Sequence, residues 1–127
     1  MNNVRHTIVL LLFIALMGCA SGEARKLGEI EFVFTNSSAH DLDWVRLDWE
    51  GPSVSAGIMK SGANATRLDT PWPDISKAKL TFVDDQTRQR YNIDVSFTEA
   101  NAQIRAHKCH RITLRILGYD KAGVVCE

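Results

Sequence analysis

The chain has 127 residues, and its 15 Lys and Arg residues balance its 15 Asp and Glu residues, so its formal net charge at pH 7 is zero. A chain without net charge has no bulk electrostatic attraction to nucleic acid or anionic lipid, which argues against both as its main partners. The roughly 100 residues that follow an N-terminal apolar segment suffice for one domain with a modest core, and are too few for two.

The first 18 residues have the features of an export signal. Arg5 and His6 form a basic start without any acid, and the run from Thr7 to Met17 contains no charged residue. A basic region followed by a short apolar region is typical of signal peptides. A membrane-spanning helix needs about 20 apolar residues, and this run is shorter. We therefore predict a removable signal peptide over residues 1–18.

The segment Leu16–Cys19 resembles the lipobox of bacterial lipoproteins, with Met17 standing where a smaller residue is usual. The resemblance implies that Cys19 is acylated and becomes the first residue of the mature chain. Ala20, where Asp would hold such a protein at the inner membrane, implies transfer to the outer membrane, facing the periplasm. Residues 19–26 would form the lipidated cysteine and a polar tether, keeping the domain within roughly 25 Å of the headgroups.

Period-two alternation recurs through residues 27–127, which we predict to form a single domain. In Glu29–Thr35, the residues Ile30, Phe32 and Phe34 share one face, as in a half-buried strand. Similar alternation between turn residues predicts strands over Leu42–Trp49, Lys77–Asp84, Arg90–Phe97 and His110–Leu117, with shorter ones in Val54–Met59, Ala65–Leu68 and Val124–Val125.

Two segments depart from this pattern. Pro71-Trp72-Pro73 constrains the backbone twice around an aromatic residue and predicts a rigid corner. Thr98–Ala106 is rich in helix formers, and Thr98 is a candidate N-cap for a short helix that crosses between strands. The whole pattern predicts a β-rich, all-β class domain with one short helix. We expect an immunoglobulin-like antiparallel β-sandwich, with a small β-barrel as the alternative.

The cysteines predict one disulfide. With Cys19 assigned to lipid, Cys109 and Cys126 remain as a pair in a chain exported to an oxidising compartment. A simple hairpin that pairs them would centre its turn on Leu117-Gly118, slightly before the better turn residues Gly118–Lys121. We therefore expect a bulge or a change of strand near the disulfide.

Metal and catalytic motifs are weak in this sequence. His107–His110 clusters ligand types around Cys109, but His40 is the one other histidine after the signal segment, which is few for a four-ligand zinc site. The sequence contains no Gly-x-Ser-x-Gly elbow, no Gly-rich phosphate loop and no His-Glu-x-x-His helix. His40-Asp41 has the composition of an ordinary turn. We expect no catalytic residues, metal or cofactor, and no enzyme activity.

Charge is distributed unevenly along the domain. Residues 29–50 carry six acids and one base, whereas residues 105–121 carry five bases and one acid. These segments either lie side by side and neutralise each other, or leave an acidic face that binds a protein. Trp44 is out of phase with the core set of its strand, so it is the leading candidate for an exposed anchor. The predicted partner-binding residues are Trp44, Asp41, Asp43, Arg46, Asp48 and Trp72.

A small, lipid-tethered β-domain without catalytic motifs resembles the immunity lipoproteins that neutralise toxic effectors delivered into the periplasm. The resemblance lies in size, location and architecture. It implies a protein partner, such as a secreted toxin, and membrane contact through the N-terminal lipid, without nucleic acid. The alternatives are a structural or assembly lipoprotein of the envelope or of a secretion machine, and a small-ligand binder or enzyme.

Overall fold

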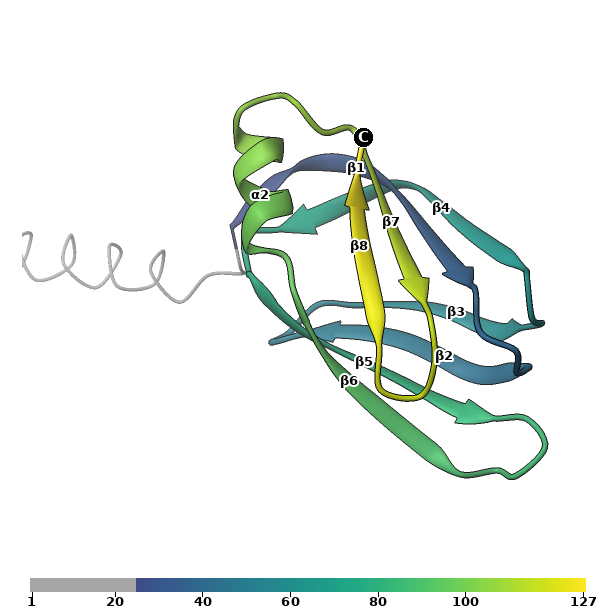
Figure 1. Cartoon of the computed structure of the whole chain (residues 1–127). Helices are drawn as coiled ribbons and strands as arrows, with labels where there is room; N and C mark the ends of the chain where they lie inside the picture. The colour runs from purple at the N-terminus through teal and green to yellow at the C-terminus, as the bar shows by residue number, and fades with distance from the viewer. Residues whose placement is uncertain (1–24) are drawn as a thin grey trace, which may run out of the picture.

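The computed structural model describes residues 25–127, which form eight strands and one short helix (Figure 1). The predicted signal peptide, Cys19 and the tether as far as residue 24 lie outside the described residues. In chain order the elements are β1 (Lys26–Asn36), β2 (Leu42–Trp49), β3 (Ser53–Met59), β4 (Asn64–Pro73), β5 (Lys77–Asp84), β6 (Arg90–Ser96), α2 (Thr98–Arg105), β7 (Arg111–Ile116) and β8 (Ala122–Cys126).

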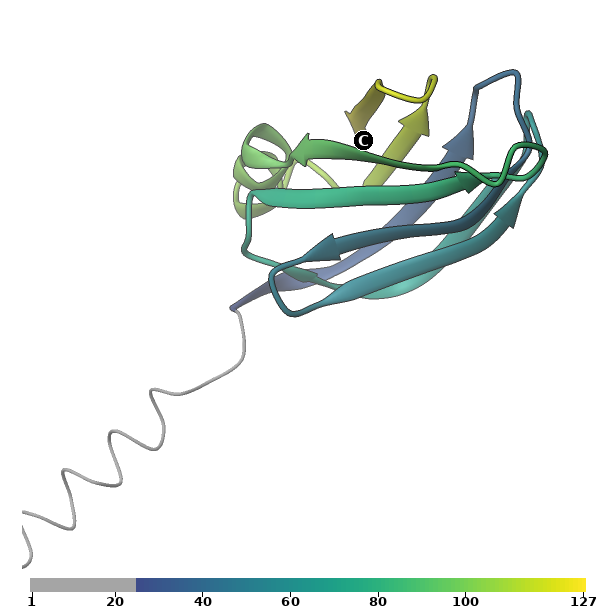
Figure 2. The same ribbon diagram turned by 90° about the horizontal axis from the view of Figure 1, so that it is seen from below.

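The strands form two four-stranded sheets, with the orders β4-β1-β7-β8 and β3-β2-β5-β6. The sheets lie face to face as a sandwich, and α2 covers one end of it (Figure 2). The predicted β-sandwich is confirmed. The barrel alternative is wrong, because the outer strands of one sheet do not pair with those of the other. One pair departs from the antiparallel expectation: β1 and β7 are parallel, since α2 carries the chain across to the sheet of β1 before β7 begins.

Alternation along the strands places the core where the sequence predicts it. Phe32 and Phe34 of β1, Leu47 of β2 and Leu80 of β5 all point inward and are fully buried. Ile112, Leu114 and Ile116 of β7, which lies beside β1 in the same sheet, are also fully buried. Burial of each such side chain contributes about 1.5–3 kcal/mol, so these interdigitating residues supply most of the driving force for packing the two sheets.

The structure corrects the interpretation of Pro71-Trp72-Pro73. These residues form no corner, because β4 continues along β1 as far as Pro73, which pairs with Lys26. Proline is tolerated there because β4 is an edge strand, whose outer N–H groups need no partner. Trp72 is 0% exposed and donates from Nε1 to Asn101 Oδ1 at 2.8 Å. The prediction of Trp72 as a partner contact was therefore wrong.

The helix forms where predicted, but its start differs. Thr98 is the first helical residue, Phe97 occupies the N-cap position, and no side chain caps the helix. Ser96 Oγ instead accepts a hydrogen bond from the Thr98 N–H at 3.4 Å. Asn101 and Ile104 are buried, and together they attach α2 to the end of the core.

The predicted disulfide joins Cys109 to Cys126, with their Cα atoms 5.6 Å apart. The expected bulge is unnecessary, because Cys126 pairs with Ile112 and not with Cys109. This register centres the hairpin on the favoured turn residues, where Leu117 N–H donates to Lys121 O at 2.9 Å. Cys109 reaches the end of β8 from the segment that precedes β7.

The folded domain begins before the predicted end of the tether at residue 26. Lys26 already belongs to β1, and the Asp74 N–H donates to Arg25 O at 2.6 Å. Arg25 is thus held against the segment after β4.

Candidate partner-binding face

A β-bulge shapes the predicted site on β2. Leu42 and Val45 are both buried although they are three residues apart, which strict alternation forbids. The pairing with β5 skips from Asp43 to Arg46, so the strand contains an extra residue at this level. Trp44 lies in the bulge with a φ of 53°, and its side chain is 68% exposed. The prediction that Trp44 is exposed is confirmed.

The neighbouring strand is irregular at the same level. Gly57 of β3 has a φ of 70°, which suits glycine because it has no Cβ to clash. After Gly57 the alternation shifts, so that Met59 is buried and Ile58 is 68% exposed. In the β2–β3 register, Ile58 lies between the residues that pair with Leu42 and Val45, and therefore opposite the bulge formed by Asp43 and Trp44. Two large apolar side chains are therefore exposed at one level of the sheet.

A shallow hollow of about 240 Å³ lies beside Trp44 on this sheet. Arg46 and Asp48 of β2 form one side of it, Thr81 and Val83 of β5 lie in the middle, and Arg90 of β6 closes the other side. We call Trp44, Ile58 and the residues around this hollow the bulge face. Sequence reasoning missed Ile58. The signal was Gly57 inside an apolar strand, which often marks a bulge.

The carboxylates around Trp44 are paired locally. Arg46 Nε donates to both carboxylate oxygens of Asp48 at 2.8 Å, and this hydrogen bonding raises the pKa of Arg46. Asp43 Oδ1 accepts the Trp44 N–H at 2.7 Å, which helps to hold the bulge, while Asp43 Oδ2 lies 3.4 Å from Arg88 Nη1. The bulge face is therefore a set of ion pairs around apolar side chains.

Asp41 lies outside the bulge face, in the loop before β2. Its carboxylate accepts the Ser61 N–H at 2.9 Å and lies 3.3 Å from Lys60 Nζ. These hydrogen bonds, first that from Ser61 and then that from Lys60, lower the pKa of Asp41 below 3.8. Asp41 thus joins the β1–β2 loop to the turn between β3 and β4.

These ion pairs correct both interpretations of the charge pattern, which were mutual neutralisation of the two charged segments and an acidic face that binds a protein. Glu31 of β1 does lie beside β7, where its carboxylate is 3.1 Å from Arg111 Nη2. Asp43 and Asp48 of β2 are in the other sheet, however, where they pair with Arg88 and Arg46, and Asp41 in the loop before β2 pairs with Lys60. The acidic face predicted on β2 is therefore largely neutralised, and apolar exposure is its more distinctive property.

A second polar cluster joins three loops at the end of the sandwich opposite α2. Asp84 is 3% exposed, and its carboxylate accepts the Tyr119 hydroxyl at 2.5 Å and the N–H groups of Gln86 and Thr87 at 2.8 and 2.9 Å. The Tyr119 bond, followed by the backbone bonds, lowers the pKa of Asp84 to about 2, and the same carboxylate raises the pKa of Tyr119 to about 12. His40 stacks on Tyr119 with ring centroids 4.6 Å apart. The cluster therefore stabilises the loops.

Within residues 25–127, no three His, Cys, Asp or Glu side chains converge as a metal site would require. The sulfur of Cys109, the central residue of the His107–His110 cluster, is bonded to Cys126. The helix in this part of the chain, α2, has eight residues and is too short to cross a membrane.

The structure brings together Trp44, Asp43, Arg46 and Asp48 on one face of β2, as the sequence predicts for partner binding. Asp41 lies at the adjoining loop, and Trp72 lies in the core. Comparisons with protein-family models, curated proteins and solved structures found no match to this chain.

Proposed function

We propose that this domain is a protein-binding module whose contact surface is the bulge face. The observation that carries the proposal is the conformation of Trp44, which combines high exposure with a left-handed backbone. A bulky residue in that region costs about 1–2 kcal/mol, and its exposed ring recovers little of this cost in the isolated domain. Such strain persists where the surrounding structure enforces it, and it clusters at functional sites, including those that contact a ligand.

The composition of the bulge face supports a protein as the partner. Trp and Arg are common among the residues that dominate binding energy, particularly where polar groups surround an apolar centre. Here Trp44 and Ile58 are exposed at one level of the sheet, and the Arg46–Asp48 pair lines the hollow beside Trp44. Complete burial of each apolar side chain would contribute up to about 1.5–3 kcal/mol, which is enough to determine where the partner docks.

We further propose that the module is a lipid-anchored immunity lipoprotein, and that its partner is a toxic effector delivered into the periplasm. The sequence supports this proposal through the export signal and the resemblance of Leu16–Cys19 to a lipobox. The Cys109–Cys126 disulfide supports an exported location, because such bonds persist mainly in oxidising compartments. The function proposed is therefore binding, without catalysis.

Site-specific photocrosslinking in cells tests the contact surface. A photoreactive amino acid at position 44 is compared with one at Leu68, which is 73% exposed on β4 of the other sheet and is thus a matched control. We expect a discrete crosslinked protein from position 44 alone. Equal crosslinking from both positions, or from Leu68 alone, would contradict the proposal.

A protection assay tests the immunity function with the protein captured at position 44. Cells that express this protein in the periplasm should survive only when the domain is co-expressed. Trp44→Ala should abolish protection, whereas Leu68→Ala should preserve it. If the captured protein is harmless, and deletion of the domain alone causes an envelope defect, the immunity proposal fails and the assembly alternative replaces it.

A further inference from the structure

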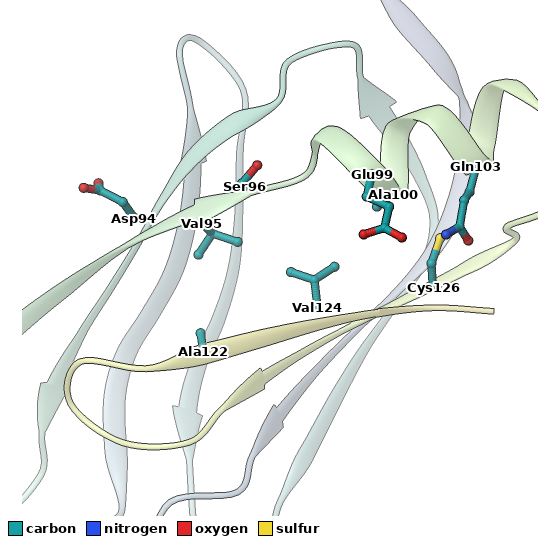
Figure 3. A pocket seen from close by; sticks show the side chains of 9 residues that line it. All are labelled: Asp94, Val95, Ser96, Glu99, Ala100, Gln103, Ala122, Val124 and Cys126. Atoms are coloured by element: carbon teal, nitrogen blue, oxygen red, sulfur yellow. The ribbon is translucent and has the colours of Figure 1, made fainter.

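The two long sides of the sandwich differ. On one side, the Arg67 guanidinium of β4 donates two hydrogen bonds to Ser55 O of β3, at 3.1 Å from Nε and 2.7 Å from Nη2, and so bridges the sheets. On the opposite side a hollow of about 350 Å³ lies between β6 and β8, with α2 above one end (Figure 3). Val95 and Val124 point into this hollow from the two strands, and the Glu99 carboxylate projects toward it from α2.

The edge of β8 presents unused backbone groups beside this hollow. Glu127 N–H donates to Arg111 O at 2.8 Å, and Leu117 N–H donates to Lys121 O at 2.9 Å. In an antiparallel ladder the hydrogen-bonded residues alternate, so the intervening residues of β8 direct their N–H and C=O groups away from β7. These residues are Ala122, Val124 and Cys126, whose side chains line the hollow. Within residues 25–127, no other strand pairs with this edge.

The other three sheet edges carry features that discourage pairing, and β8 does not. The edge strand β3 is bulged at Gly57, β4 contains Pro71 and Pro73, and β6 carries Arg90 and Asp94. The sequence of β8 is Ala-Gly-Val-Val-Cys, and all five residues are half-buried. Natural proteins usually protect a sheet edge with charge, proline or a bulge, so an unprotected, apolar edge next to a hollow suits strand addition.

The charge around the hollow indicates which segment fits. Its ionisable side chains are Glu99, which projects over the centre, and Asp94 at the rim. Neither carboxylate forms an ion pair with another residue in the described part of the chain. A segment that paired with β8 would bring every second side chain into the hollow, between Val95 and Val124. Small apolar side chains at those positions, with Lys or Arg close to Glu99, complement the surface.

We propose that β8 accepts an extended segment of a partner protein as an added strand, with alternate apolar side chains in the hollow and a basic side chain facing Glu99. The proposal is independent of the bulge face, which belongs to the other sheet. The inward side chains of an added strand would also fill part of the hollow beside β8, whose five residues are all half-buried.

Backbone NMR of the full chain in detergent micelles tests the proposal with defined probes. All peptides carry Thr at the outward positions and Val at the inward positions; the Val–Lys peptide has Lys in place of one terminal inward Val, the Val–Glu peptide has Glu there, and a third peptide is the Val–Lys peptide with N-methylated amides. We expect the Val–Lys peptide alone to bind, and to slow hydrogen exchange at the amides of Ala122, Val124 and Cys126. The N-methylated peptide should fail, because it cannot complete the ladder.

Two variants separate backbone pairing from charge. Val124→Pro removes an N–H that is not bonded to β7, so the fold should persist while affinity falls more than tenfold, and Val124→Thr is the matched control that keeps the N–H. Glu99→Gln should weaken binding of the Val–Lys peptide by up to about 5-fold, as expected for an exposed ion pair. Glu99→Lys should transfer the preference to the Val–Glu peptide, a result that does not depend on tolerance of proline in β8.

Three results would overturn the proposal. The first is unchanged affinity in Val124→Pro, and the second is peptide protection at β3 or β4 in place of β8. The third is protection of the same β8 amides that rises with protein concentration before peptide is added, because a second copy of the chain would then occupy the edge. Loss of crosslinking at Trp44 would leave all three measurements unaffected, so the two proposals fail separately.

Discussion

Strain at Trp44 can be measured by comparing Gly and Ala substitutions at two exposed positions. With a φ of 53°, Trp44 lies in a region that costs a residue with a Cβ about 1–2 kcal/mol. Glycine avoids this cost but loses about 0.5–1 kcal/mol through greater freedom in the unfolded chain. We therefore expect Trp44→Gly to be more stable than Trp44→Ala by about 0.5–1 kcal/mol.

Ile58 provides the control, because it is equally exposed and lies outside the left-handed region. There the order should reverse, with Ile58→Gly less stable than Ile58→Ala by about 0.5–1 kcal/mol. Urea unfolding followed by circular dichroism measures all four free energies of unfolding. If Gly is no better than Ala at position 44, the strain argument is refuted. If Trp44→Gly is the more stable of the two variants, the left-handed backbone at this position carries a measurable cost in the isolated domain.

Three further predictions concern stability. Trp72→Phe should lower the free energy of unfolding by about 1–3 kcal/mol more than Trp49→Phe does, because Trp72 loses a buried hydrogen bond to an amide whereas Trp49 Nε1 has no partner among residues 25–127. Urea unfolding curves of equal slope measure the difference, and equal losses of stability would contradict the prediction. The lowered pKa of Asp84 gives stability that is complete above pH 3.8 and is lost as the pH falls toward about 2. The melting temperature of an Asp84→Asn variant should therefore fall less than that of the wild type between these pH values. An equal fall in both proteins would exclude Asp84 as the cause of the acid sensitivity. Replacing Cys109 and Cys126 by Ser should cost about 3 kcal/mol, measured against a reduced wild-type sample, which should be equally destabilised.

The sequence by itself determined the faces of the strands and the disulfide. Phe32, Phe34 and Leu114 are buried as their alternation predicts, because the period of a strand is a local property and needs no knowledge of its neighbours. Cys109 and Cys126 could be paired from sequence because Cys19 was assigned to lipid. The exposure of Trp44 also followed from its phase relative to Val45.

Tertiary structure alone decided the features that depend on strand neighbours. The fixed φ of Pro71 and Pro73 is compatible with a corner and with an edge strand. The position of β4 at the edge of its sheet decided in favour of the strand, in which Trp72 is buried. The bulge that aligns Trp44 with Ile58 exists only in the pairing of β2 with its neighbours. Strand pairing joins residues far apart in the chain, so local periodicity predicts which face a residue occupies, whereas the fold determines what lies beside it.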